Sequence, residues 1–203
     1  MKSIAIFCGS SLGTDAIFAE TAQRTGKLIA EQGKTLVYGG GRSGLMGIVA
    51  DSALAAGGKV IGVIPQGLVD RELAHPHLTE LHVVTSMHER KTLMADLSDG
   101  FIALPGGAGT LEEIFEQWMW AQLGIHLKPC AFLNVEGFYD ALWQFIQLTT
   151  EKEFTRRRFT DALINSNSIE DILEQFEHFV APQAKWGVQD HQDLVKVDAL
   201  NTK

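Results

Sequence analysis

Residues 101–113 read FIALPGGAGTLEE, and this segment decides the fold class. Its first four residues, Phe101–Leu104, are apolar and typical of a strand, and the glycines that follow separate them from a helix that extends to about Leu123. The same succession recurs at Ser3–Cys8 before GSSLG and at Thr35–Tyr38 before GGGRSG. These apolar runs do not alternate with polar residues, which indicates strands covered on both faces. We therefore predict an α/β fold, with a Rossmann-like, doubly wound parallel sheet flanked by helices in a single domain.

The rest of the chain continues the alternation of strand and helix. Further strands are expected at residues 59–64, 81–85 and 130–133. Further helices are expected at residues 14–32, 45–56, 88–97, 139–150 and 168–180. We expect the domain to span residues 1–181, followed by a polar C-terminal tail over residues 182–203.

Composition excludes several classes of protein. The 203 residues carry a formal net charge of −8, and an acidic surface repels a phosphate backbone, so nucleic acid is not an expected partner. No apolar run approaches the length of a membrane span, so no membrane association is expected. The start, MKSIAIF, reads as a strand without a cleavage site, which predicts a cytoplasmic protein. Cys8 and Cys130 lie in apolar stretches and are expected to be buried, reduced thiols.

The glycine-rich loops predict a phosphate site. Ligands of such folds bind at the carboxyl ends of the strands, where glycines allow close approach and free N–H groups at helix starts attract anions. The loop at residues 39–44 matches the glycine spacing of a dinucleotide fingerprint, but the next strand ends in VIPQ without the required acid. Leu45 and Met46 stand where a P-loop needs lysine and a hydroxyl residue. Neither a nicotinamide, a flavin nor a P-loop nucleotide site is therefore expected.

Charged side chains accompany the loop that follows Leu104. Thr110 and Glu113 are three residues apart on one side of a helix start, which fits either a capping box or contact with a ligand. Arg90 and Lys91, in the segment MHERK, are expected at the same edge of the sheet, either as phosphate or sugar ligands or as a solvated basic helix end. The two interpretations stay open for each pair.

Two weaker patterns concern a possible interface and a possible metal site. The helix after the glycine loop has apolar residues on more than one face, which favours a homodimer interface over burial in the monomer core; these residues are Leu111, Ile114, Phe115, Trp118, Met119, Trp120 and Leu123. His75 and His77 do not form a convincing metal-ligand pattern, so no metal is expected. No cofactor is expected, since Lys91 lacks the surroundings of a pyridoxal-phosphate lysine.

In combination, the motifs resemble the LONELY GUY family of cytokinin riboside 5′-monophosphate phosphoribohydrolases, whose members also carry the label lysine decarboxylase. The matching segments occur in order between residues 3 and 150 and are FCGSS, YGGG with GLMG, GVIP, MHERK, PGGAGTLEE and WAQLGIH. The resemblance implies hydrolysis of the N-glycosidic bond of adenosine 5′-monophosphate (AMP), often N6-substituted, to a free base and ribose 5-phosphate.

The resemblance also implies the roles of individual residues. Arg90 and Glu113 would be the catalytic pair, whereas Glu72, Lys91 and the stretch Gly107–Glu113 would bind the nucleotide. The predicted substrate-binding residues are thus Ser10, Gly40, Gly41, Glu72, Arg90, Lys91, Gly107, Ala108, Gly109, Thr110, Leu111, Glu112 and Glu113.

The chemistry assigns different tasks to the catalytic pair. Cleavage builds positive charge on the sugar, which an ionised Glu113 would stabilise, and the helix start should favour that ionised form. Arg90 would hold the phosphate or ribose. The alternative function is a non-catalytic nucleotide carrier, since molybdenum-cofactor carriers share a similar glycine motif. A passive phosphate binder gains nothing from a carboxylate beside its anion, so the pair favours the enzyme.

Overall fold

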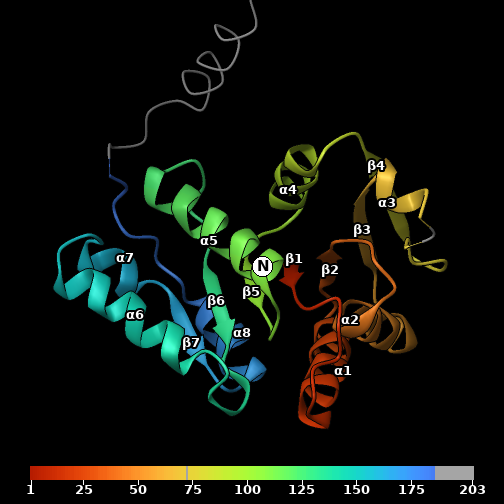
Figure 1. Ribbon diagram of the computed structural model, residues 1–203, viewed down its shortest axis with the longest axis horizontal. Helices are drawn as coiled ribbons and strands as arrows, with labels where there is room; N and C mark the ends of the chain where they lie inside the picture. The colour runs from red at the N-terminus through yellow and green to blue at the C-terminus, as the bar shows by residue number, and fades with distance from the viewer. Residues whose placement is uncertain (72, 186–203) are drawn as a thin grey trace, which may run out of the picture.

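The computed structural model describes residues 1–71 and 73–185 and contains one seven-stranded parallel sheet (Figure 1). Its strand order is β4-β3-β2-β1-β5-β6-β7. The strands are β1 (Ser3–Phe7), β2 (Thr35–Tyr38), β3 (Val60–Pro65), β4 (Glu80–Val84), β5 (Phe101–Ala103), β6 (Cys130–Leu133) and β7 (Ile164–Ser166). All six pairings between neighbours are parallel. The predicted doubly wound α/β fold is confirmed.

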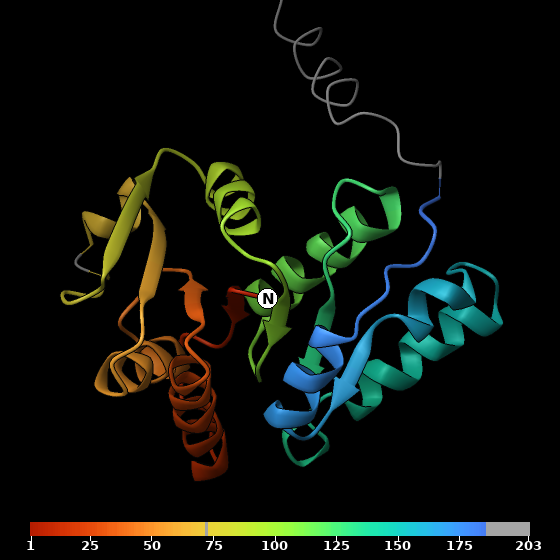
Figure 2. The same ribbon diagram turned by 180° about the vertical axis from the view of Figure 1, so that it is seen from behind.

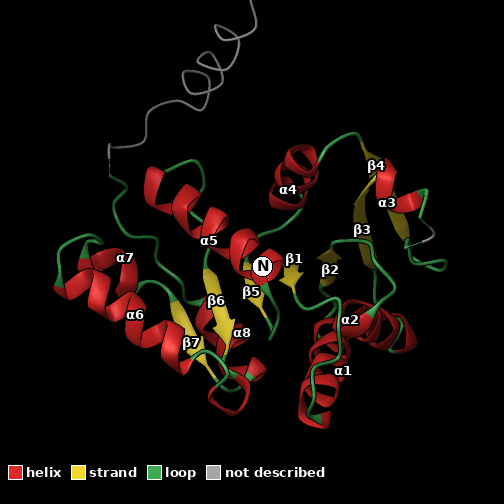
Figure 3. Ribbon diagram, in the orientation of Figure 1, coloured by secondary structure: helices red, strands yellow, loops and turns green. Residues whose placement is uncertain are grey.

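Helices cover both faces of this sheet (Figures 2 and 3). One face packs against α1 (Ala16–Glu31), α2 (Gly44–Ala55) and α8 (Ile169–Glu177). The other packs against α4 (Met87–Asp96), α5 (Ala108–Leu123), α6 (Asp140–Glu151) and α7 (Arg157–Asp161). The short helix α3 (Gln66–Val69) and the 3-10 turn η1 (Val135–Gly137) lie in connections.

The central strand shows why apolar runs form the sheet. Side chains alternate along β1, so Ile4 and Ile6 enter the core under α1 and α2, whereas Ala5 and Phe7 enter the core under α4 and α5. All four are essentially inaccessible to solvent. Burial of one isoleucine or phenylalanine contributes about 1.5–3 kcal/mol, so a strand without alternation is stable only between two helix layers.

The strand order creates a crevice beside β1. After β1 the chain winds outward through β2 and β3 to β4, and then returns to place β5 on the other side of β1. Ile6 pairs with Tyr38 of β2 and with Ile102 of β5. The loops after β1 and β5 therefore diverge to opposite faces, and ligands of such folds bind at this switch point.

The structure differs from the sequence-based expectations in several elements. β7 was not expected, because INS is short and its two polar residues are half-buried; it forms an edge, where polar residues are tolerated. α5 begins at Ala108 with Gly107 as its N-cap and without a side-chain cap. Thr110 lies inside the helix, so the capping-box interpretation of Thr110 and Glu113 is wrong.

The apolar residues of α5 are mostly buried within the chain itself. Ile114 is inaccessible and Trp118 is 9% exposed, and the indole N–H of Trp118 donates to the carbonyl oxygen of Phe159 at 3.2 Å. Leu111, Phe115 and Trp120 pack partly buried against the same core, while Met119 stays 47% exposed. The core therefore accounts for most of the pattern that favoured a dimer interface, and the homodimer remains a prediction.

The two cysteines are in the state that the sequence predicts. Cys8 and Cys130 are free, buried thiols, and burial raises the pKa of both. Among residues 1–71 and 73–185, no helix combines the length and apolar character needed to cross a membrane. The expected C-terminal tail lies outside the described residues from position 186 onward; before that point Ala184 is buried, and the N–H of Lys185 donates to the carbonyl oxygen of Gln122.

Candidate active site

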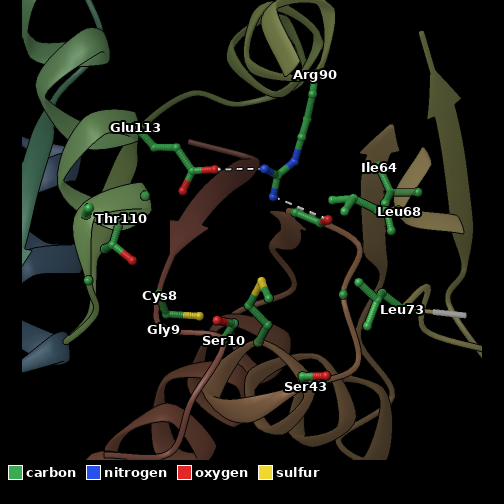
Figure 4. Close-up of a pocket in the computed structure, with 16 residues that line it drawn as sticks. Cys8, Gly9, Ser10, Ser43, Ile64, Leu68, Leu73, Arg90, Thr110 and Glu113 are labelled. Carbon is green, nitrogen blue, oxygen red and sulfur yellow. Dashed lines mark hydrogen bonds and ion pairs between the residues drawn. The ribbon is translucent and has the colours of Figure 1, made fainter. Parts of the chain in front are cut away.

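A cavity of about 420 Å³ occupies the switch point beside β1 (Figure 4). Its lining residues come from the loops after β1 and β2, from α2, from the end of β3 and the segment after it, and from the starts of α4 and α5. They are Cys8, Gly9, Ser10, Gly39, Gly41, Ser43, Met46, Ile64, Leu68, Leu73, Arg90, Gly107, Ala108, Gly109, Thr110 and Glu113. The volume is that of a small-molecule site.

A buried ion pair crosses this cavity. Nη1 of Arg90 lies 3.2 Å from Oε1 of Glu113, and each residue is 8% exposed. Figure 4 shows the two side chains reaching toward each other from α4 and α5. Arg90 and Glu113 belong to helices that are separate in the sequence. They meet only because the starts of α4 and α5 lie on the same side of the sheet. The two residues that the sequence analysis expected at one edge of the sheet are therefore in contact with each other.

Backbone carbonyls hold the guanidinium in place. Nε of Arg90 donates to the carbonyl oxygen of Val63 at 3.1 Å, and Nη2 donates to that of Gly39 at 3.4 Å. Together with Glu113, these contacts engage all three nitrogens of the side chain. A Cβ at Gly39 would overlap Nη2 of Arg90, so only glycine leaves the guanidinium room in this position.

The start of α4 is fixed by side-chain capping. Oγ of the N-cap residue Ser86 accepts from the N–H of Glu89 at 3.1 Å. The carboxylate of Glu89 reaches back and accepts from both the N–H and the hydroxyl of Thr85, at 2.8 and 2.7 Å. Arg90 follows directly after this capped turn. The cap thus sets the direction in which Arg90 leaves its helix, and it is worth about 1 kcal/mol.

Glu113 is in an environment that disfavours its charge. Burial raises the pKa of its carboxyl above the usual value, and the adjacent Arg90 opposes this effect only in part. The sequence-based expectation had the opposite direction, because it placed Glu113 in the first turn of α5. The helix begins at Ala108, so Glu113 lies in the second turn, where the influence of the helix dipole has fallen off.

The first turn of α5 offers an anion site. Gly107, Ala108, Gly109 and Thr110 all line the cavity, and the first N–H groups of a helix have no carbonyl partner within it. No atom lies within 4 Å of the Cβ positions of Gly107 and Gly109, so a ligand has space above this turn. A phosphate here would lie within the same cavity as the ion pair.

Eight of the thirteen predicted site residues line the cavity, and they are Ser10, Gly41, Arg90, Gly107, Ala108, Gly109, Thr110 and Glu113. Gly40, Lys91, Leu111 and Glu112 are placed outside its lining. Glu72 lies outside the described residues.

Lys91 faces away from the cavity and toward α5. Its ammonium contacts the carboxylate of Glu112 and, at 3.0 Å, that of Glu116. Partial burial opposes the charge of Lys91, but these two glutamates outweigh it and raise the pKa of the amine. Neighbours in a helix point about 100° apart, so Arg90 and Lys91 reach different surroundings. Lys91 thus connects α4 with α5.

Sequence reasoning missed the apolar wall of the cavity. Ile64, Leu68 and Leu73 lie opposite Thr110 and Glu113 in Figure 4, and Met46 of α2 adds to the lining. Only Ile64, at the end of a predicted strand, had a positional signal, because ligands bind at such ends. The others are apolar residues of a helix and a loop, which in sequence look like core residues. Four more lining residues belong to the predicted strand end and glycine-rich loops but were not among the predicted site residues; they are Cys8, Gly9, Gly39 and Ser43.

Comparison with known proteins places this site in a family. Residues 46–176, more than half of the chain, match the family model described as "Possible lysine decarboxylase". A cytokinin riboside 5′-monophosphate phosphoribohydrolase of Rhodococcoides fascians is 46% identical over 173 residues, covering 85% of this chain and 87% of its own. The chain belongs to the LONELY GUY family. The cytokinin riboside 5′-monophosphate phosphoribohydrolase LOG of Oryza sativa subsp. japonica is 43% identical over 179 residues, covering 88% of this chain and 74% of its own.

Solved structures confirm the fold of this LONELY GUY family member. A molybdenum cofactor binding protein from Rippkaea orientalis superposes with a TM-score of 0.67 at 22% identity, covering 87% of this chain and 96% of its own. The molybdenum cofactor carrier protein of Chlamydomonas reinhardtii gives a TM-score of 0.67 at 20% identity, covering 89% and 99%. At such low identity the likeness concerns the fold alone.

Proposed function

We propose that this protein hydrolyses the N-glycosidic bond of AMP or of N6-modified (cytokinin) riboside 5′-monophosphates, releasing the base and ribose 5-phosphate. The observation that carries the proposal is the buried contact between Arg90 and Glu113 beside the α5 start. The names of the relatives from R. fascians and O. sativa, which cover most of this chain, support the same reaction.

The cavity accommodates the parts of a nucleotide in a consistent order. The phosphate would accept hydrogen bonds from the first turn of α5, and the ribose would lie against the paired side chains of Arg90 and Glu113. The apolar wall of Ile64, Leu68 and Leu73 suits the face of a purine base. In this arrangement the positive charge of Arg90 offsets the repulsion between the carboxylate of Glu113 and the phosphate. A phosphate site with an unpaired carboxylate would lack this compensation.

Catalysis would rest on charge stabilisation. As the glycosidic bond breaks, the electron pair leaves with the base and positive charge develops on the ribose. The carboxylate of Glu113 would stabilise this charge, or direct the water that attacks the sugar carbon. The water oxygen bonds to that carbon, and the proton that the water loses balances the proton that the departing base takes up. A fixed charge in a buried cavity acts strongly, because little water screens it.

A nucleotide or molybdenum-cofactor carrier is the alternative function, and the fold is shared with such proteins. A carrier needs a phosphate site but has no use for a buried carboxylate beside it. Burial raises the pKa of Glu113, so keeping its charged form in the folded protein costs stability. A glycosyl hydrolase has a use for such a buried carboxylate. The enzyme is therefore the better supported function.

We propose binding roles for Glu72 and Lys91, a homodimer, a cytoplasmic location and a domain that ends at residue 181. Static light scattering at micromolar concentration tests the homodimer; a monomeric mass would contradict it.

Incubation with AMP and with N6-isopentenyl-AMP, followed by chromatography of the free base, tests the function. We expect stoichiometric release of base and ribose 5-phosphate from at least one of the two. Adenosine, which lacks the phosphate, is the matched control substrate and should react far more slowly. Tight binding of both nucleotides without release of base would identify a carrier and overturn the proposal.

A further inference from the structure

His75 forms hydrogen bonds with both ring nitrogens although it lies outside the cavity lining. Its ring is 3% exposed, with Nε2 3.0 Å from Oδ1 of Asp51 on α2. Nδ1 lies 3.2 Å from the backbone nitrogen of His77. A backbone N–H only donates, so Nδ1 must be the unprotonated acceptor and Nε2 must carry the proton that is donated to Asp51. These partners define a neutral imidazole with one tautomer.

The backbone around His75 is joined to the glycine loop after β2. The N–H of His75 donates to the carbonyl oxygen of Gly40 at 2.9 Å, and the N–H of Arg42 donates to that of Leu73 at 3.0 Å. Gly41 and Ala74 form an isolated antiparallel bridge between these hydrogen bonds. Residues 73–75 thus lie along residues 40–42 as a short two-stranded ribbon.

This ribbon is part of the cavity wall. Gly41 from one side of it and Leu73 from the other both line the cavity, and Figure 4 shows Leu73 on the side opposite Glu113. The chain between β3 and the ribbon contains the four-residue helix α3, which has no buried residue. A segment with so little buried surface needs other contacts to keep one position.

We propose that His75 is a positioning residue, which holds residues 73–75 against the glycine loop and so helps to form the apolar wall of the nucleotide site. The inference rests on the proposed function for its substrate. His75 acts through two contacts: its Nδ1 stabilises the turn to His77, and its Nε2 connects this turn to α2. Asp51 is 72% exposed in its side chain, so its contact is the weaker one.

A metal site is the other use of two nearby histidines, and the structure argues against it. Nδ1 of His75 is already occupied by a backbone N–H. Within residues 1–71 and 73–185, no group of three histidine, cysteine or acidic side chains is placed to hold a metal ion. The ring of His75 is therefore explained by its contacts within the fold.

Two substitutions separate the contacts of the ring. Glutamine in His75→Gln extends its amide toward Asp51 but leaves the N–H of His77 without an acceptor. Asparagine in His75→Asn places an oxygen near the position of Nδ1 and restores that acceptor. His77→Asn is the matched control, because the side chain of His77 is exposed and its backbone N–H is retained.

For His75→Gln we expect the KM for the nucleotide to rise about three- to tenfold, the effect of one hydrogen bond, with kcat within about twofold of wild type. His75→Asn should give a smaller rise and His77→Asn none. Trypsin should cut faster after the exposed Arg71 in His75→Gln, while the melting temperature changes by a few degrees at most. This combination distinguishes positioning from a general loss of stability.

Several results would overturn the inference. They are an unchanged KM in both His75 variants, a fall in kcat alone, or faster trypsin cleavage throughout the chain with a large fall in melting temperature. Trypsin cleavage at Arg71 does not depend on turnover. If the wild-type protein binds AMP but does not hydrolyse it, the proposed function fails, and the effect of His75→Gln on AMP affinity still tests the positioning role.

Discussion

Replacement of Glu113 by glutamine tests the site most directly. Gln has the same shape and keeps an oxygen that can accept from Nη1 of Arg90, 3.2 Å away. What it lacks is the negative charge. Loss of one such fixed electrostatic contact raises the barrier by about 2.7–4 kcal/mol, so we expect kcat to fall roughly 10²- to 10³-fold. Release of base from AMP under saturating conditions measures this loss.

The same substitution should have little effect on folding. Burial raises the pKa of Glu113, so a neutral side chain removes an unfavourable charge from the folded state. Arg90 keeps its hydrogen bonds to the carbonyl oxygens of Val63 and Gly39. We expect a change of about 1 kcal/mol or less in the free energy of unfolding, which corresponds to roughly 2–4 °C in melting temperature. Glu113→Ala, which leaves Arg90 without its acceptor, should cost about 3–5 kcal/mol.

The pKa of Glu113 also determines the sign of a pH effect. With a raised pKa, the folded protein holds a proton at a pH where the unfolded chain has lost it. The stability from this group is therefore fully present below the usual value of 4.5 and decreases as pH rises through the folded pKa. The melting temperature of Glu113→Gln should improve relative to wild type over that interval. Normal hydrolysis by Glu113→Gln together with a much lower melting temperature would refute the catalytic role and leave a structural one.

Three further predictions concern the surroundings of Glu113. Arg90→Gln should raise the KM and lower kcat together. Because Arg90 lowers the pKa of Glu113, the substitution should also move the acidic limb of the pH profile of kcat to higher pH. Unchanged kinetics would show that Arg90 is not part of the site. Gly39→Ala should reproduce much of the kinetic defect of Arg90→Gln, since the new Cβ overlaps the guanidinium, and wild-type activity would contradict the geometry in Figure 4. Lys91→Met should lower the melting temperature by breaking its contacts between α4 and α5; a selective rise in KM without that loss would instead support the predicted binding role of Lys91.

Local sequence patterns predicted most of the fold because the signals involved are themselves local. Apolar runs without alternating polar residues, such as Ser3–Cys8 and Phe101–Leu104, indicated strands covered on both faces. The glycines after them marked the loops at one edge of the sheet. β7 was not predicted, because a three-residue edge strand with polar residues has no such pattern. Its position is set by pairing with β6, for example between Ile164 and Ala131.

Sequence patterns indicate the start of a helix less precisely than they indicate a buried strand. The spacing of Thr110 and Glu113 fits a capping box, but α5 begins at Ala108 and uses Gly107 as its N-cap. Side-chain capping is found instead at the start of α4, where Ser86 accepts from the N–H of Glu89 and the Glu89 carboxylate accepts from the N–H of Thr85. Spacing alone does not fix where a helix begins, because the preceding loop competes for the same backbone groups.

The sequence by itself determined the parallel α/β architecture, the glycine-rich edge that suits a phosphate, and the pair of charged residues most suited to a sugar cation. Only the tertiary structure decided that Arg90 and Glu113 share one buried cavity while Lys91 turns away to Glu112 and Glu116. The tertiary structure also determined which residues form the apolar wall and in which direction the pKa of Glu113 shifts. The physical reason is that burial, and contacts between residues far apart in the chain, arise only when separate segments pack together.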